Sequence, residues 1–71
     1  MKVNIALLTV TDTRTIDNDK SGAILVKKIE EAKHNLIDRK ICKDNKDEIV
    51  VILKNWLQNN QIDVIITTGG T

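Results

Sequence analysis

The sequence predicts an α/β domain of three layers, in which strands and helices alternate in the order βαβαβ around one parallel sheet. Two segments, Val3–Val10 and Ile62–Thr67, are apolar at almost every position and rich in β-branched residues, which is typical of strands covered on both faces. Two others, following Ser21 and Asn45, repeat their apolar residues every three or four positions, as amphipathic helices do. Trp56 is the only aromatic residue, so the core must be aliphatic, which suits such a sheet.

The first strand is expected over Val3–Val10, and the polar turn Thr11–Arg14 closes it. A loop follows over 15–20. Ser21 is the expected N-cap of a helix that continues to about Ala32, because a serine side chain can accept a hydrogen bond from a free backbone N–H of the first turn. The residues expected on the inner face of this helix are Leu25, Ile29 and Ala32.

The second half of the sequence repeats this order of strand and helix. Leu36–Lys43 alternates apolar and polar residues, the pattern of a half-exposed strand at a sheet edge. Asn45 is the expected N-cap of the next helix, and Glu48, three residues on, completes a capping box. The third strand is expected over Ile62–Thr67. The expected inner face of the second helix consists of Ile49, Ile52, Leu53, Trp56 and Leu57.

The strand order follows from the right-handed crossovers that parallel strands require. Because the second strand is amphipathic and the other two are continuously apolar, the second belongs at the edge, giving the spatial order 2-1-3. Ligands of open α/β sheets bind outside the carboxyl ends of the strands, where the strand order reverses. The sequences that flank this point are Thr9–Arg14 and Thr67–Thr71, and Asp44 lies on the same rim.

Composition limits the classes of partner. Lys and Arg number 11 against 10 Asp and Glu, a net charge of +1, which gives no electrostatic reason to expect a nucleic acid or an anionic membrane as partner. Cys42 is the only cysteine, which excludes a disulfide within the chain and fits a reducing cytosol. The apolar run Val3–Val10 is too short to span a membrane and has no signal-peptide cleavage pattern, so a soluble, cytoplasmic protein with a small-molecule or protein partner is expected.

The turn Thr68-Gly69-Gly70-Thr71 is the main candidate ligand site. Paired glycines free the backbone to turn, and the bare N–H groups, with the threonine hydroxyls, can hold a phosphate. The alternative is an ordinary packing turn. The residues leave the two interpretations equally open, since this turn has no Walker lysine.

Two carboxylates on the rim are further candidates. Asp12 can bind a metal or a ligand hydroxyl, or it can simply form an Asx-turn. Asp44 can bind Mg²⁺ on a nucleotide phosphate, or it can stabilise the start of a helix through its charge. From the residues alone, the structural interpretation is favoured for both. The segment 17–22 is similar to a calcium-binding loop, but Lys28 stands where that loop needs a glutamate, so it is interpreted as a polar loop near the site.

Four segments, at compatible spacing, together resemble the molybdenum cofactor biosynthesis family that includes MoaB and MogA. They are Leu8–Arg14, Asn18–Gly22, Lys43–Asn45 and Thr67–Thr71. The resemblance implies a molybdopterin-binding α/β domain, of which residues 1–71 would be the N-terminal part, cut after the third strand.

The resemblance also implies an activity and its residues. Enzymes of this family transfer the adenylyl group of Mg²⁺-ATP to the terminal phosphate of molybdopterin, and they assemble as trimers or hexamers. By matching position, Asp44 would be the carboxylate tied to Mg²⁺ and to catalysis. The residues that would line or flank the phosphate and pterin pocket are Thr11, Asp12, Thr68, Gly69, Gly70 and Thr71.

The family continues beyond the position of Thr71 with a further catalytic aspartate, so the 71-residue piece is not expected to adenylylate by itself. Three alternatives stay open. The parent protein can be a non-catalytic pterin-binding or oligomer-forming paralogue, or a related domain of a competence-associated, nucleotide-processing protein. The third alternative is a structural fragment that binds nothing.

Overall fold

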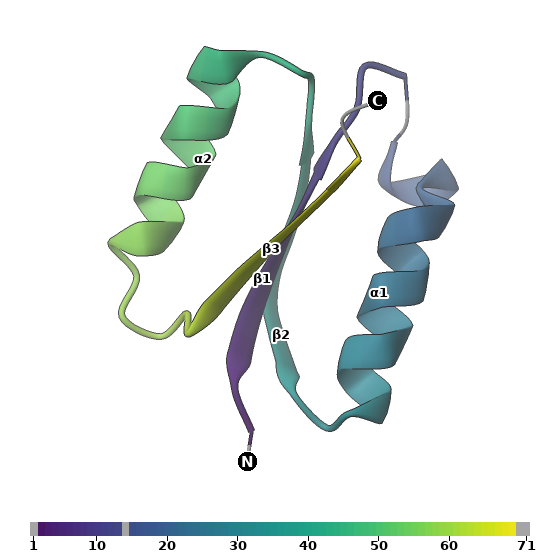
Figure 1. Cartoon of the computed structure of the whole chain (residues 1–71), viewed down its shortest axis with the longest axis vertical. Coiled ribbons are helices and arrows are strands. Elements are labelled where there is room, and N and C mark those ends of the chain that lie inside the picture. The colour runs from purple at the N-terminus through teal and green to yellow at the C-terminus, as the bar shows by residue number, and fades with distance from the viewer. Residues whose placement is uncertain (1, 14, 70–71) are drawn as a thin grey trace.

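The computed structural model describes residues 2–13 and 15–69. Over these ranges the chain forms strands β1 (Asn4–Val10), β2 (Asn35–Cys42) and β3 (Val64–Gly69), helices α1 (Lys20–Glu31) and α2 (Lys46–Leu57), and a 3₁₀ turn, η1 (Ile16–Asn18). The strands are parallel, and β1 lies between β2 and β3. The sheet lies between α1 and α2 (Figure 1). The predicted three layers and the order 2-1-3 are confirmed.

The core is built on β1, where every residue from Ile5 to Thr9 is buried. Ala6 and Leu8 point toward α2 and pack with the buried Trp56 in one apolar cluster. Thr9 points to the other face, where it contacts Asp19 at the start of α1. The continuous apolar run in the sequence therefore reflects a strand that has a helix on each side.

The start and end of α1 differ from the prediction. The N-cap is Asp19, whose Oδ1 accepts the Gly22 N–H at 3.1 Å, and the helix begins at Lys20. Ser21 is exposed and lies inside the helix. Both residue types cap well, and Asp19 takes the position because Thr9 of the sheet holds its side chain. Ala32 is exposed at the C-cap, because the chain already leaves the helix there.

The start of α2 matches the prediction in part. Asn45 is the N-cap, and its Oδ1 accepts the N–H groups of Asp47 and Glu48 at 2.9 and 3.3 Å. The capping box is not formed, since the Asn45 N–H donates to the Lys43 carbonyl at 2.7 Å instead of to the Glu48 side chain.

The inner face of α2 is centred on Trp56. This side chain is 4% exposed, and its Nε1–H donates to Asp38 Oδ2 on β2 at 3.0 Å. Leu57 is 75% exposed, so the prediction that it belongs to the inner face was wrong. It is the last residue of the helix, one position beyond Trp56, which already fills the contact with the sheet. Neither α1 nor α2 is long and apolar enough to cross a bilayer, and the described residues contain no other helix that is.

Of the two outer strands, β2 is exposed as predicted and β3 is more exposed than predicted. The half-exposed β2 lies at one edge, as expected. Residues of β3 were expected to be covered on both faces, but Val64 is 41% exposed and Ile65 and Ile66 are only half-buried. The reason is that β3 forms the other edge and pairs with β1 alone among the described strands.

Asn4 joins the strands at the amino end of the sheet. Its Nδ2 donates to the Gln61 carbonyl at 2.8 Å, and its Oδ1 accepts from Asn35 Nδ2 at 3.0 Å. Its backbone N–H donates to Asp63 Oδ2 at 2.9 Å. These bonds tie this end of the sheet together, while the carboxyl ends carry the candidate ligand residues.

Candidate functional site

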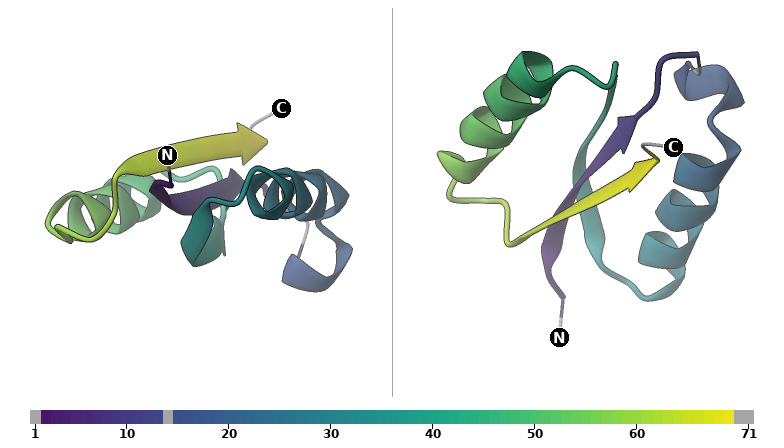
Figure 2. Two further views of the ribbon diagram at one scale, coloured as in Figure 1. Left: turned by 90° about the horizontal axis from the view of Figure 1, so that it is seen from below. Right: turned by 45° about the horizontal axis from the view of Figure 1, so that its top comes forward.

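The predicted site residues come together at the carboxyl ends of the strands. Figure 2 shows β1 and β3 ending at the same side of the sheet. In the parallel register, Thr9 lies beside Thr68 and Val10 beside Gly69. Gly70 and Thr71, which were also assigned to the pocket, lie outside the described residues.

The turn after β1 is joined directly to the turn after β2. Beyond the last strand pair, the Thr11 N–H donates to the Cys42 carbonyl at 2.8 Å. The Asp44 N–H then donates to Asp12 Oδ1 at 3.1 Å. Asp12 and Asp44 are both exposed, so their carboxyl groups remain accessible from solvent. The sequence correctly placed them on one rim.

The contact to Asp44 also bears on the structural alternatives. Asp12 Oδ1 accepts the N–H of a residue 32 positions away, so its side chain links two turns. The Asx-turn considered for Asp12 would use the N–H of Arg14, which lies outside the described residues. In the same turn, Thr11 Oγ1 accepts the Thr13 N–H at 3.4 Å. The N-cap of α2 is Asn45, so Asp44 stands just outside the helix.

Gly69 adopts a conformation that few other residues can. Its φ is +92°, in the left-handed region. A Cβ at this position would collide with the carbonyl oxygen of Val10. Glycine is therefore required here by the close approach of β3 to β1, whether or not the turn also binds a ligand.

The rim carboxylates are oxygen ligands of the kind that Mg²⁺ takes. Mg²⁺ in nucleotide sites usually takes one or two carboxylates and completes its shell with water and substrate phosphates. Asp44 offers one such carboxylate, and Asp12 Oδ1 already accepts the Asp44 N–H. Among the described residues, no three His, Cys, Asp or Glu side chains come together to hold a metal ion.

Asp19 is the residue that sequence analysis missed. It is 2% exposed, and its Oδ2 accepts the Thr9 hydroxyl at 2.6 Å and lies 3.5 Å from Arg39 Nη2. Burial alone would raise the pKa of Asp19, but the hydrogen bonds from Thr9 and Gly22, with the Arg39 guanidinium, lower it below the usual value. A signal was present, because Thr9 is a hydroxyl inside a buried strand and such a group needs a partner.

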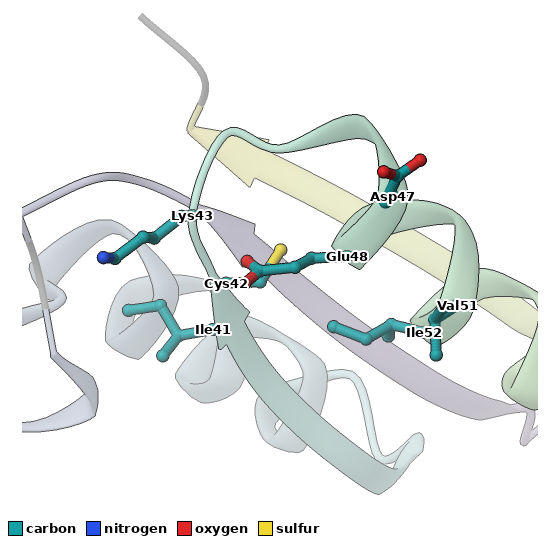
Figure 3. Close-up of a pocket in the computed structure, with 7 residues that line it drawn as sticks. All are labelled: Ile41, Cys42, Lys43, Asp47, Glu48, Val51 and Ile52. Atoms are coloured by element: carbon teal, nitrogen blue, oxygen red, sulfur yellow. The ribbon is translucent and has the colours of Figure 1, made fainter.

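An open groove of about 590 Å³ lies between β2 and α2. Figure 3 shows the side chains that line it, which are Ile41, Cys42, Lys43, Asp47, Glu48, Val51 and Ile52. Burial raises the pKa of the Cys42 thiol, and the nearby Glu48 and Asp44 carboxylates raise it further. The groove lies on the β2 side of the sheet, whereas the sequence predicted a ligand crevice between β1 and β3.

The chain is similar to known proteins over nearly its whole length. The family model described as a probable molybdopterin binding domain matches residues 6–71. Molybdenum cofactor biosynthesis protein B of Staphylococcus epidermidis is 43% identical over 97% of this chain and 41% of its own length. The protein of the same name from Escherichia coli K12 is 36% identical over 94% of this chain and 39% of its own length.

A solved structure shows the same likeness in three dimensions. A crystal structure of molybdenum cofactor biosynthesis protein B superposes with a TM-score of 0.93 and 35% identity, covering 100% of this chain and 44% of that one. The chain therefore spans less than half the length of these relatives. A family match over residues 6–71, together with the shared fold, shows that this chain belongs to the family of probable molybdopterin binding domains.

Proposed function

We propose that this chain supplies the first part of a ligand site in a protein of molybdenum cofactor biosynthesis, and that the full-length protein binds molybdopterin at the rim described above. The observation that carries the proposal is that Asp12, Asp44 and the last two residues of β3, Thr68 and Gly69, lie at the same end of the sheet. The names of the relatives, which are molybdenum cofactor biosynthesis proteins, support a role in the same pathway.

The turn at the end of β3 would hold the phosphate of molybdopterin. Thr68 and Thr11 can contribute hydroxyl groups, and Gly69 lets the backbone come close to an anion. Gly70 and Thr71, the next residues in the sequence, are proposed as further ligand contacts through backbone N–H groups and one hydroxyl. Asp12 lies on the same rim, where it accepts the Asp44 N–H.

We further propose that the full-length protein adenylylates molybdopterin. A phosphate oxygen of molybdopterin would attack the α-phosphorus of ATP, and the bond to the bridging α,β-oxygen would break to release pyrophosphate. Asp44 would hold Mg²⁺ on the ATP phosphates, where the ion neutralises charge that develops on the leaving group. Catalysis of such a transfer depends mostly on positioning and charge, which a carboxylate on a rigid rim can provide.

The cytoplasm is the proposed location, and a trimer or hexamer is the proposed assembly of the full-length protein. The assembly is proposed from the resemblance to the MoaB and MogA family, and the location from the single cysteine, which fits a reducing compartment. Sedimentation of the purified protein measures the assembly directly.

The activity is tested with the full-length protein, molybdopterin and Mg²⁺-ATP, by measuring release of pyrophosphate. The proposal predicts release that requires both substrates and stops when the metal is chelated. Binding of molybdopterin without release would instead indicate a non-catalytic pterin-binding protein. No binding of molybdopterin would contradict the proposal as a whole.

A further inference from the structure

We propose that Asp12 is a positioning residue, which fixes the backbone of Asp44 and thereby directs the Asp44 carboxylate into the site. This inference rests on the proposed function, in which Asp44 holds Mg²⁺. It differs from the sequence prediction, which gave Asp12 a direct contact with the ligand.

The first observation is the bond itself. Asp44 N–H donates to Asp12 Oδ1 at 3.1 Å, although the two residues are 32 positions apart. The side chain of Asn45, the next residue, already accepts the backbone N–H groups of Asp47 and Glu48. The Asp44 N–H therefore lies just outside the region that Asn45 caps, and Asp12 supplies its acceptor.

The second observation is that both neighbours of Asp12 in the chain are hydrogen-bonded. On one side, the Thr11 N–H donates to the Cys42 carbonyl at 2.8 Å, which extends the pairing of β1 with β2 by one residue. On the other side, the Thr13 N–H donates to Thr11 Oγ1 at 3.4 Å. A carboxylate presented from such a frame can hold its partner in a fixed place.

The chemistry of the bond separates positioning from metal binding. An amide oxygen accepts an N–H almost as well as a carboxylate oxygen does, so Asp12→Asn keeps the bond while removing the charge. Asp12→Ala removes both. If Asp12 bound Mg²⁺, its negative charge would be required, and Asp12→Asn would lower activity nearly as much as Asp12→Ala.

Amide hydrogen exchange of Asp44, followed by NMR in the full-length protein, tests the bond without any need for activity. Asp12→Ala should accelerate exchange at Asp44 about tenfold, and Asp12→Asn by no more than about twofold. Asp17→Ala is the matched control, because it removes the same charge from an exposed position in the same loop. Equal acceleration by Asn and Ala, or none by either, would overturn the inference.

Kinetics then test whether the bond acts through Asp44. Asp12→Ala should lower kcat about tenfold with little change in KM for molybdopterin, and Asp12→Asn should lower it less. In an Asp44→Asn background, Asp12→Ala should cause no further loss, since the residue that it positions is already disabled. If the double variant instead lost activity by the product of the two single losses, Asp12 and Asp44 would act independently and the inference would be overturned. If the wild type releases no pyrophosphate, the proposed activity fails, while the exchange measurement still decides whether Asp12 holds Asp44.

Discussion

The carboxylate of Asp19 accepts a 2.6 Å hydrogen bond from the hydroxyl of Thr9, and both residues are buried between the sheet and α1. The same carboxylate caps α1 through the Gly22 N–H and lies beside Arg39 of β2. One side chain thus joins the central strand, an edge strand and a helix. It also fixes the far end of the loop that carries Thr11 and Asp12.

Asp19→Ala should destabilise the full-length protein by about 3 kcal/mol, because the helix loses its N-cap and the Thr9 hydroxyl is left buried without its acceptor. Thermal or urea unfolding measures this change. Asp17→Ala, at an exposed position of the same loop, should change stability by less than about 0.5 kcal/mol. If Asp19→Ala lowered the free energy of unfolding no more than Asp17→Ala does, the contact with Thr9 would contribute nothing to stability.

The contribution of the Asp19 charge should depend on pH. Its pKa is lowered in the folded protein, so its stabilising effect is complete above the usual aspartate pKa of 3.8 and is lost as pH falls through the folded pKa. Wild type should therefore exceed Asp19→Asn in stability by a constant amount above about pH 5, and the difference should shrink in acid. A difference that stayed constant into strong acid would contradict the lowered pKa.

Gly22→Ala should destabilise α1, although alanine is normally the better helix former by about 1 kcal/mol. The added Cβ would collide with the Asp19 carboxylate and come within 2.9 Å of Arg39 Nη2, so we expect a loss of about 1–3 kcal/mol. Ser21→Ala is the neighbouring control, and it should be neutral because Ser21 is not the N-cap. A loss of about 1 kcal/mol at Ser21 would restore serine as the cap.

Lys33→Gly should stabilise the protein by about 1 kcal/mol. Lys33 follows α1 with a φ of 64°, a left-handed conformation that strains any side chain with a Cβ. Its N–H donates to Glu30 and the next N–H, from His34, donates to Ile29, the pattern that usually places glycine at this position. Lys27→Gly, inside the same helix, should instead cost about 1 kcal/mol, and unfolding of both variants measures the contrast.

The sequence predicted the elements whose pattern is long and regular. The apolar run of β1 and the alternation of β2 were enough to place one strand in the centre and the other at the edge. Asn45 was identified as a cap because Glu48 follows three residues on, and Asn45 is the cap although the capping box itself does not form.

Contacts between distant residues were harder to predict. Asp19 and Ser21 cap equally well in isolation, and only the bond to Thr9, ten positions earlier, decides between them. Topology placed Asp12 and Asp44 on one rim, but their hydrogen bond depends on the exact length of two turns. The exposure of β3 depends on what pairs with its outer edge, which no local pattern contains.

The most direct test of the proposed site compares wild type and Asp44→Asn in the full-length protein, measuring molybdopterin affinity and pyrophosphate release side by side. Loss of a carboxylate that holds Mg²⁺ on the reacting phosphates should lower release about a hundredfold or more. Affinity for molybdopterin should stay within about threefold, because the turn at the end of β3 is unchanged. Wild-type release by Asp44→Asn would contradict the role of Asp44 and the site built around it.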